Sequence, residues 1–165
     1  MTKHTKTLLL LLAAGLIAVL VFVNRRLSAG DDAKAAALQL TAEIGGSEKT
    51  YDYREDHPSF QAFDTEMRRK NGDVFPKNYS GIELSVILKE LGTEVTDSTE
   101  VTAVCADNYE ITLSGEEILH EGNIWLVTQE DGQKLDEESG PFMLVVNEDE
   151  FSTRWAKNVV RIKVK

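Results

Sequence analysis

The most constraining feature of the sequence is an uncharged apolar run near its N-terminus. Residues 8–23 read LLLLLAAGLIAVLVFV. A membrane-spanning helix needs roughly 17–25 apolar residues, so this run, extended slightly by Thr7 and Asn24, is at the short end of that range. Helix is the conformation that satisfies the backbone hydrogen bonds of an open segment in lipid. The sequence therefore predicts one N-terminal transmembrane helix.

The residues that flank this run leave two processing outcomes open. Lys3 and Lys6 supply the positive charge of a secretory signal, and the small residues of Ser28-Ala29-Gly30 could be a cleavage site. Arg25 and Arg26, directly after the run, instead favour an uncleaved anchor. A lipoprotein needs a cysteine just after the apolar run, and residues 24–30, NRRLSAG, contain none. We expect an uncleaved signal anchor, with secretion after cleavage as the alternative.

The remainder of the chain is expected to be one soluble domain. Residues 1–30 are predicted to form the membrane anchor and a short linker, and residues 31–165 an extracytoplasmic domain on a single-pass protein. About 135 residues suit one hydrophobic core. All 28 acidic residues lie in residues 31–165 with 14 of the 18 basic ones, so the formal charge there is 14 − 28 = −14. Such an acidic domain is not expected to bind nucleic acid.

Short alternating or β-branched segments dominate this domain and predict strands. Gly45-Gly46 and Asn71-Gly72 mark two hairpin turns. The predicted strands cover residues 38–44, 51–53, 60–69, 74–79, 101–105, 110–113, 124–128, 142–146 and 159–164. Within 60–69, the alternation places Phe63, Thr65 and Met67 on one face.

Two capping-box patterns predict two short helices among these strands. Ser80 and Glu83 have the S-x-x-E spacing before an apolar helical face that ends at Gly92. Ser114 and Glu117 repeat the spacing before a helix through His120. Many strands with two short helices, without regular βαβ alternation, indicate an α+β fold.

The order of the motifs resembles the molybdopterin-binding domain of sulfite oxidase-type oxidoreductases. Residues 79–92 read YSGIELSVILKELG, similar to the family's Y/W-x-G-V-x-L-x-x-L-L stretch. Residues 101–109, VTAVCADNY, resemble the strand that ends in D-G-Y. Residues 125–135 resemble the next strand and its "DG-x-x-L" loop. Residues 140–146, GPFMLVV, and the closing Trp155 to Val164 are similar to G-x-P-x-R-L-V-V-P and W-x-K-x-V-x-x-I-x-V. The resemblance implies a mixed β-sheet core with short helices and covers about residues 38–165.

Two departures from the family pattern bear on function. Catalytic members of that family bind molybdenum through a cysteine about ten residues before the Y/W-x-G motif. Residues 63–70, FDTEMRRK, fill that window here and contain no cysteine. Neither a carboxylate nor a thioether replaces a thiolate without changing the metal chemistry. Met143 stands where the family has the arginine of P-x-R-L.

The resemblance points to one group of candidate cofactor-binding residues. Cys105, the only cysteine of the chain, ends the strand before the Asp107-Asn108-Tyr109 turn, whose equivalent in the family lies near the cofactor. Tyr79 is either a core residue or presents its hydroxyl to a cleft. Turn formation alone also explains Asp107 and Asn108, and core packing also explains Cys105. No catalytic residue and no metal site is predicted, because the histidines lack ligand spacing.

Two functions remain open at this point. The first is a non-catalytic module, anchored in the membrane, that binds a small ligand or a protein partner. The second is an oxidoreductase, or an accessory subunit of a membrane redox complex, that binds molybdopterin or another redox cofactor without the family thiolate. The missing cysteine favours the first, and the sequence does not identify the ligand.

Overall fold

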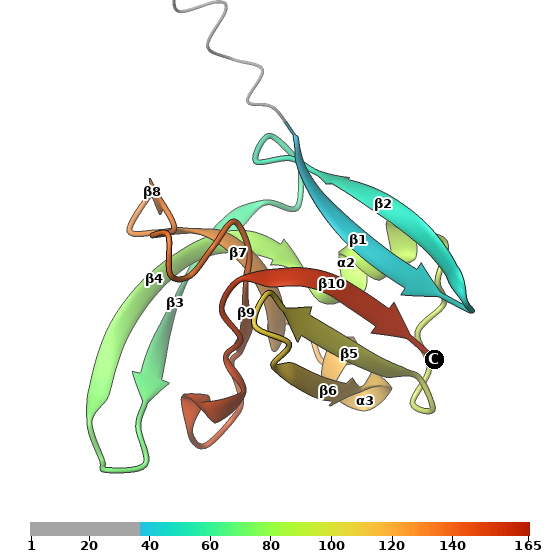
Figure 1. The fold of residues 1–165 in the computed structure, drawn as a ribbon. Coiled ribbons are helices and arrows are strands. Elements are labelled where there is room, and N and C mark those ends of the chain that lie inside the picture. The colour runs from blue at the N-terminus through green and yellow to red at the C-terminus, as the bar shows by residue number, and fades with distance from the viewer. Residues whose placement is uncertain (1–36) are drawn as a thin grey trace, which may run out of the picture. The chain divides into compact units, whose positions relative to one another are not determined.

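Ten strands and three short helical segments make up the described part of the chain. The computed structural model describes residues 37–165, so the predicted transmembrane helix at 8–23 and its processing lie outside the described residues. Within residues 37–165, no helix is long and apolar enough to cross a membrane. Figure 1 shows these strands as two sheets, with the helices beside them.

The first sheet is mixed and has the order β2-β1-β10-β5-β6. Its strands are β1 (Leu38–Ile44), β2 (Ser47–Tyr53), β5 (Glu100–Cys105), β6 (Glu110–Ser114) and β10 (Val159–Val164). β1 pairs with β2 through the Gly45-Gly46 turn and runs parallel to β10, while the other pairs are antiparallel. The parallel pair joins the first and last strands of the domain.

The second sheet is antiparallel and has the order β3-β4-β7-β8, with β9 also paired to β7. Its strands are β3 (Gln61–Arg68), β4 (Val74–Glu83), β7 (Ile124–Glu130), β8 (Gln133–Lys134) and β9 (Met143–Val146). The predicted hairpin at Asn71-Gly72 is confirmed, because Gly72 donates to the Arg69 carbonyl and Arg69 donates to the Asp73 carbonyl.

The first helix begins three residues later than the sequence predicts, with Glu83 and not Ser80 as its N-cap. Helix α2 spans Leu84–Glu90, and its N-cap residue, Glu83, makes no side-chain capping hydrogen bond. Ser80 and Glu83 instead belong to β4 and pair with Gln129 and Trp125 of β7. The predicted capping box there is therefore wrong, because pairing with β7 takes priority over local capping. The end at Gly92 is confirmed: its φ is 78°, and Gly92 and Thr93 donate to Lys89 and Leu88.

The second helix forms as predicted. Helix α3 spans Gly115–Leu119, and Ser114 and Glu117 make both hydrogen bonds of the capping box. A single turn of 3-10 helix, η1 (Ser152–Arg154), follows β9.

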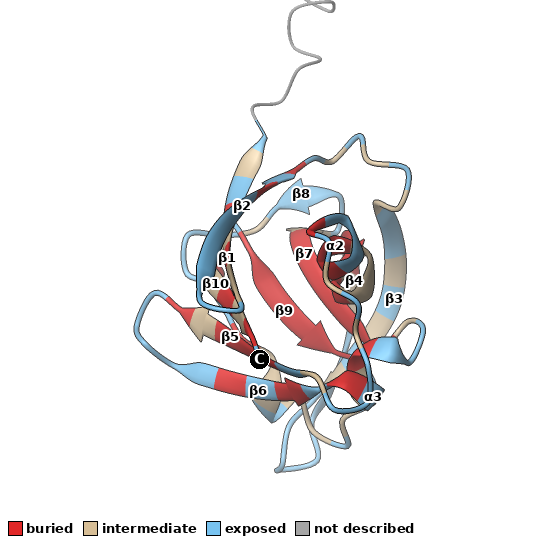
Figure 2. Ribbon diagram, turned by 90° about the vertical axis from the view of Figure 1, so that its right-hand side faces the viewer, coloured by how far each residue is buried: buried red, intermediate tan, exposed pale blue. Residues whose placement is uncertain are grey.

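One main core lies between the two sheets and beneath both helices. It gathers fully buried side chains from β1, β4, α2, β5, β6, α3, β7, β9 and β10, among them Leu40, Ile82, Ile87, Leu126 and Ile162. A smaller cluster of Tyr79, Trp125, Val127, Met143 and Val145 lies on the other face of the second sheet. Figure 2 shows β7 and β9 buried, whereas β3 at the margin is exposed along much of its length. The expected α+β fold with a mixed sheet is confirmed.

Candidate functional site

The turn between β5 and β6 forms as its residue types predict. Asn108 adopts a φ of 66°, and its N–H donates to the Cys105 carbonyl at 3.0 Å. The Asp107 side chain accepts a hydrogen bond from the Tyr109 N–H at 3.0 Å. Both hydrogen bonds join residues within positions 105–109, so the turn is stabilised by its own residues. Asp107, Asn108 and Tyr109 are all exposed, and Tyr109 is 46% exposed.

Cys105 lies beneath this turn, inside the main core. It is 3% exposed and belongs to the same cluster as Val101, Ala103 and Val159. Burial raises the pKa of the Cys105 thiol, and the nearby charge of Asp107 raises it further. A cysteine binds a metal as the deprotonated thiolate. Burial and the charge of Asp107 both favour the protonated thiol, which does not coordinate.

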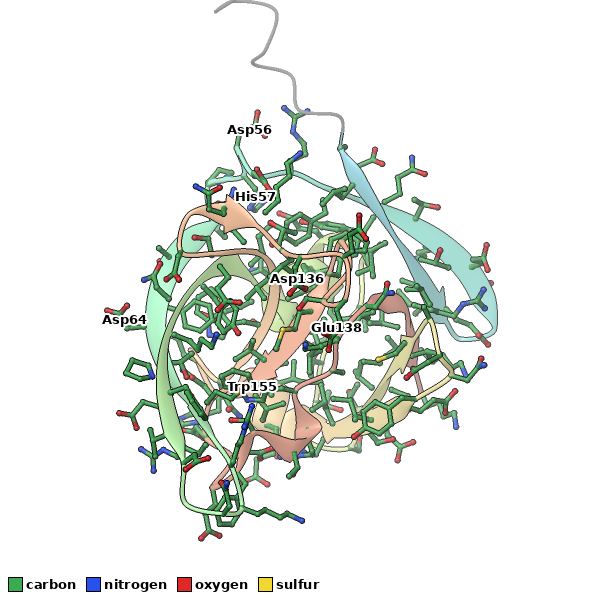
Figure 3. All side chains as sticks on the ribbon, turned by 60° about the vertical axis from the view of Figure 1, so that its left-hand side comes forward. Asp56, His57, Asp64, Asp136, Glu138 and Trp155 are labelled. Atoms are coloured by element: carbon green, nitrogen blue, oxygen red, sulfur yellow. The ribbon has the colours of Figure 1, made fainter. Side chains whose placement is uncertain are left out.

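Tyr79 lies in the smaller aromatic cluster and not beside Cys105. It is 2% exposed, and its ring packs edge-on against Trp155 with 5.8 Å between ring centroids. Phe63 stacks on Trp125 in the same cluster at 4.4 Å. Burial, followed by the charges of Glu130, Asp131 and Asp136, raises the pKa of the Tyr79 hydroxyl. Figure 3 shows Trp155 and Asp136 over this part of the second sheet.

The sequence-predicted site residues therefore occupy two places. Cys105 belongs to the main core and Tyr79 to the cluster on the far face of the second sheet. One segment touches both places: the Thr153 carbonyl accepts a 3.4 Å hydrogen bond from the Tyr109 hydroxyl, and Trp155 packs on Tyr79. The structure thus links the turn and Tyr79 through η1 rather than through a shared cleft.

Arg154 is the central residue of this segment, and it was not among the predicted site residues. Its Nε donates to Asp149 Oδ2 at 2.8 Å and its Nη2 donates to Glu117 Oε1 at 2.6 Å, so it ties η1 to α3. Both carboxylates raise the pKa of Arg154 further above its ordinary value. Nothing in the sequence spacing signals this cluster, because its members are separated by up to 37 residues.

The window in which the family places its metal ligand folds as a regular strand. Residues 63–68 belong to β3, with Phe63, Thr65 and Met67 half-buried on one face as expected and the intervening side chains exposed. Thr65 bonds to the Asn147 side chain and the Arg68 N–H donates to Ser152 Oγ. This strand contains no cysteine and no histidine, so it supplies neither a thiolate nor an imidazole ligand.

The described residues do not fit a molybdenum cofactor held as catalytic members hold it. The one thiol is buried in the core, and Met143, at the family's arginine position, is 4% exposed in the aromatic cluster. The basic side chains near this cluster are already paired, Lys77 with Glu130 and Lys157 with Glu138. Within residues 37–165, no group of three or more His, Cys, Asp or Glu side chains is arranged to hold a metal ion.

The fold is similar to that of a solved oxidoreductase structure. Sulfane dehydrogenase SoxCD from Paracoccus pantotrophus matches with a TM-score of 0.62 and 18% sequence identity, over 76% of this chain and 37% of that chain. At that identity the likeness shows the fold alone, and this chain spans little more than a third of that protein's length. No curated protein matches the sequence.

A family model settles the relationship that the motifs suggested. The model of the oxidoreductase molybdopterin binding domain matches residues 49–165, well over half of the chain. The match includes the Y-S-G motif of β4, the β5–β6 turn and the closing strand β10. This chain belongs to the family of oxidoreductase molybdopterin-binding domains.

Proposed function

We propose that this protein is a non-catalytic member of its family, a binding module for a small ligand or a protein partner, held at the outer face of a membrane. The observation that carries the proposal is the position of Cys105. It is the one cysteine of the chain, and its side chain is packed into the main core.

The family's ligand position holds no cysteine here, and burial keeps the one thiol of the chain from taking its place. Coordination needs a deprotonated sulfur that faces a cofactor. To expose Cys105, the turn at residues 106–109 would have to separate from β10. The Ala106 N–H bond to the Asn158 carbonyl, at 2.9 Å, opposes that separation.

The exposed turn supplies the best candidate contact surface among the predicted residues. Asp107, Asn108 and Tyr109 are exposed while their backbone is fixed by local hydrogen bonds, so side chains face solvent on a rigid support. A rigid exposed tyrosine beside hydrogen-bonding groups is common at binding surfaces, because little conformational entropy is lost on contact. Tyr79 could contribute only if Trp155 moved away.

The location of the module rests on the N-terminal sequence. The apolar run at residues 8–23 supports anchoring, and confinement to a membrane raises the effective concentration of a module toward a membrane-bound partner. Protease accessibility of an epitope tag added after Lys165, measured in intact cells, tests the side on which the domain lies. Mass spectrometry of the mature N-terminus distinguishes the anchored protein from a cleaved, secreted one.

Molybdenum content tests the proposal directly. The full-length chain is produced in cells that make molybdenum cofactor, purified in detergent, and assayed for metal and for pterin. A catalytic family member purified from the same cells is the positive control. We expect neither molybdenum nor pterin in this protein when the control is loaded, and stoichiometric molybdenum would overturn the proposal.

The alternative is an oxidoreductase, or a subunit of a redox complex, that holds molybdopterin or another redox cofactor. Family membership is the observation in its favour. It predicts that Cys105→Ser loses cofactor and activity, whereas the binding module keeps its partner in that variant and loses only stability.

A further inference from the structure

The β3–β4 hairpin ends in an exposed turn. Arg68, the last residue of β3, still bonds to the body of the domain, because its N–H donates to Ser152 Oγ at 2.9 Å. Residues 69–76, which follow and which we call the hairpin tip, are all exposed. Figure 1 shows this end of the hairpin projecting from the rest of the described domain. The side chains of the tip are therefore available to a partner.

The backbone of the hairpin tip is held by its own hydrogen bonds. The Arg69 N–H donates to the Asp73 carbonyl at 2.9 Å, and the Gly72 N–H donates to the Arg69 carbonyl at 3.0 Å. The Asn71 side chain donates to the Asp73 carboxylate at 2.8 Å and accepts from the Asp73 N–H at 3.1 Å. The tip is thus pre-formed, and little conformational entropy is lost when it binds.

The hairpin tip is basic within an acidic domain. Among the ion pairs of residues 37–165, none includes Arg69 or Lys70. Residues 66–77 carry four basic and two acidic side chains, a formal charge of 4 − 2 = +2. The rest of the predicted soluble domain carries −14 − 2 = −16. An anionic target is therefore attracted at the tip and repelled by the remainder of the domain.

Two large apolar side chains are exposed beside these cations, on opposite faces of the hairpin. Val74 is 49% exposed and Phe75 is 37% exposed. They are successive residues of β4, so their side chains point to opposite faces. The Arg69 guanidinium lies 4.8 Å from the centroid of the Phe75 ring, so a cation and an aromatic ring share one face. Both faces of the tip remain accessible in the described part of the domain.

These features together select an anionic lipid surface as the partner. A free anion would use the cations but would leave Val74 and Phe75 in water. A protein interface takes about 20–30 residues a side, whereas the tip has eight and divides its apolar groups between two faces. Lipids close around a convex tip and contact both faces, with phosphates for the cations and acyl chains for the apolar side chains.

We propose that the hairpin tip binds the headgroup region of an anionic membrane, with Val74 and Phe75 inserted at the level of the upper acyl chains. Arg69 binds a lipid phosphate through the N–H groups at its edge while the flat face of the guanidinium stays on Phe75. Lys70 supplies a second positive charge to the headgroups. The proposal shares with the proposed function only the expectation that the domain lies beside a membrane, and it involves neither Cys105 nor the β5–β6 turn.

The length of the linker is compatible with contact on the membrane that the N-terminal run is predicted to enter. Residues 24–36 are thirteen positions, which reach at most about 45 Å when extended. The ten-residue strand β4, which ends the hairpin side of the domain, is roughly 33 Å long. The tether is therefore long enough for the tip to reach the same bilayer.

A fluorescent label at the hairpin tip tests the proposal. The full chain with Pro76→Cys is labelled with an environment-sensitive dye, and Cys105 stays unlabelled because it is buried. The protein is reconstituted in vesicles of phosphatidylcholine alone or with phosphatidylglycerol, each with some lipid that carries a nitroxide quencher on its acyl chain. We expect quenching and a blue shift of the dye only in the anionic vesicles. Ser47→Cys, at the exposed β1–β2 turn, is the matched control and is expected to stay unquenched in both.

Charge reversal tests the part played by the cations. Arg69→Glu/Lys70→Glu is expected to lower the quenching of the tip label in anionic vesicles by about tenfold or more, because both attractive charges become repulsive. Lys134→Glu/Lys165→Glu changes the net charge by the same amount at exposed positions outside the tip. This second variant is expected to leave the quenching unchanged.

Removal of the apolar groups tests insertion. Val74→Ser/Phe75→Ser keeps both cations and is expected to abolish quenching by the acyl-chain nitroxide. A nitroxide on the lipid headgroup is expected still to quench the label in this variant. Full retention of acyl-chain quenching would contradict insertion.

The remaining outcomes decide whether the partner is lipid. Equal quenching of the Pro76→Cys and Ser47→Cys labels overturns the proposal, and so does tip quenching that survives the charge reversal. A blue shift in native membranes but not in protein-free anionic vesicles also overturns it and identifies a protein as the partner. Thermal melting checks that each variant is folded. Molybdenum content is unaffected by any of these results, so failure here is distinct from failure of the proposed function.

Discussion

Arg154 donates two hydrogen bonds to Asp149, from Nε to Oδ2 at 2.8 Å and from Nη2 to Oδ1. The same Nη2 reaches Glu117 at the start of α3. All three side chains are at most one-third exposed, so the charges are only partly screened by solvent. This cluster holds η1, and with it Trp155, against the rest of the domain.

Removal of the arginine charge is expected to destabilise the domain. Arg154→Met keeps much of the side-chain volume but removes the guanidinium from Asp149 and from Glu117, which keeps only its bonds from Ser114. We expect a loss of about 1–3 kcal/mol in the free energy of unfolding. Tryptophan fluorescence in urea measures it. Lys157→Met is the matched control, because Lys157 forms an exposed pair with Glu138 and should cost under about 1 kcal/mol. Equal losses in the two variants would contradict a special role for Arg154.

The acid sensitivity of the fold is expected to depend on Glu117. Burial alone raises the pKa of this carboxyl, but hydrogen bonds from Arg154 and Ser114 outweigh burial and hold the pKa below the ordinary 4.5. The ionised form is therefore favoured in the folded state. The stabilisation is fully present above the unfolded-state pKa and is lost as pH falls through the folded-state pKa.

Chemical denaturation between neutral pH and the acid range tests this dependence. Stability of the wild type should decrease as pH falls below about 4.5, and Glu117→Gln should be less stable at neutral pH with a shallower decrease. Parallel curves for the two proteins would show that Glu117 does not contribute. Glu116→Gln, on an exposed neighbour, is the control.

Cys105 is expected to be unreactive in the native protein. With 3% of its surface exposed and its pKa raised by burial, the thiol should react with a disulfide reagent only after unfolding. Cys105→Ser should cost about 1–3 kcal/mol, because it buries a hydroxyl among apolar side chains, and Cys105→Ala should cost less than the serine variant. Rapid labelling of the folded protein would favour the cofactor-binding alternative.

Gly81 is expected to tolerate no side chain. A Cβ at this position would lie 2.4 Å from the Leu126 carbonyl oxygen and 2.8 Å from the Val127 Cα, both backbone atoms of β7. The register shift between β4 and β7 lies at Ser80 and Gly81, so the glycine allows this close approach.

Gly81→Ala should therefore cost about 1–3 kcal/mol or more, because β4 must move away from β7. Gly45→Ala is the comparison: it meets no atom within 4 Å, and its cost comes from a φ of 57° alone. That cost is expected to be about 1 kcal/mol. A smaller loss at Gly81 than at Gly45 would contradict the steric argument.

The sequence by itself determined most of the local structure. Alternation predicted β1, the Asn71-Gly72 dipeptide predicted the β3–β4 hairpin, and Ser114 with Glu117 predicted the start of α3. Each of these depends on residues within a few positions of one another, so local propensity is enough. The family could be recognised from the same sequence, because its motifs keep their order and spacing.

Tertiary structure decided the rest, because those features depend on residues far apart in the chain. Ser80 and Glu83 carry the same spacing as Ser114 and Glu117, yet pairing with β7 holds them in a strand. Cys105 and Tyr79 were both candidate cofactor-binding residues, and packing places them in separate clusters. The parallel pairing of β1 with β10 and the contacts of Arg154 join segments up to 120 positions apart. Burial and charge in the folded domain determine which segments pair, and no short sequence pattern indicates these pairings.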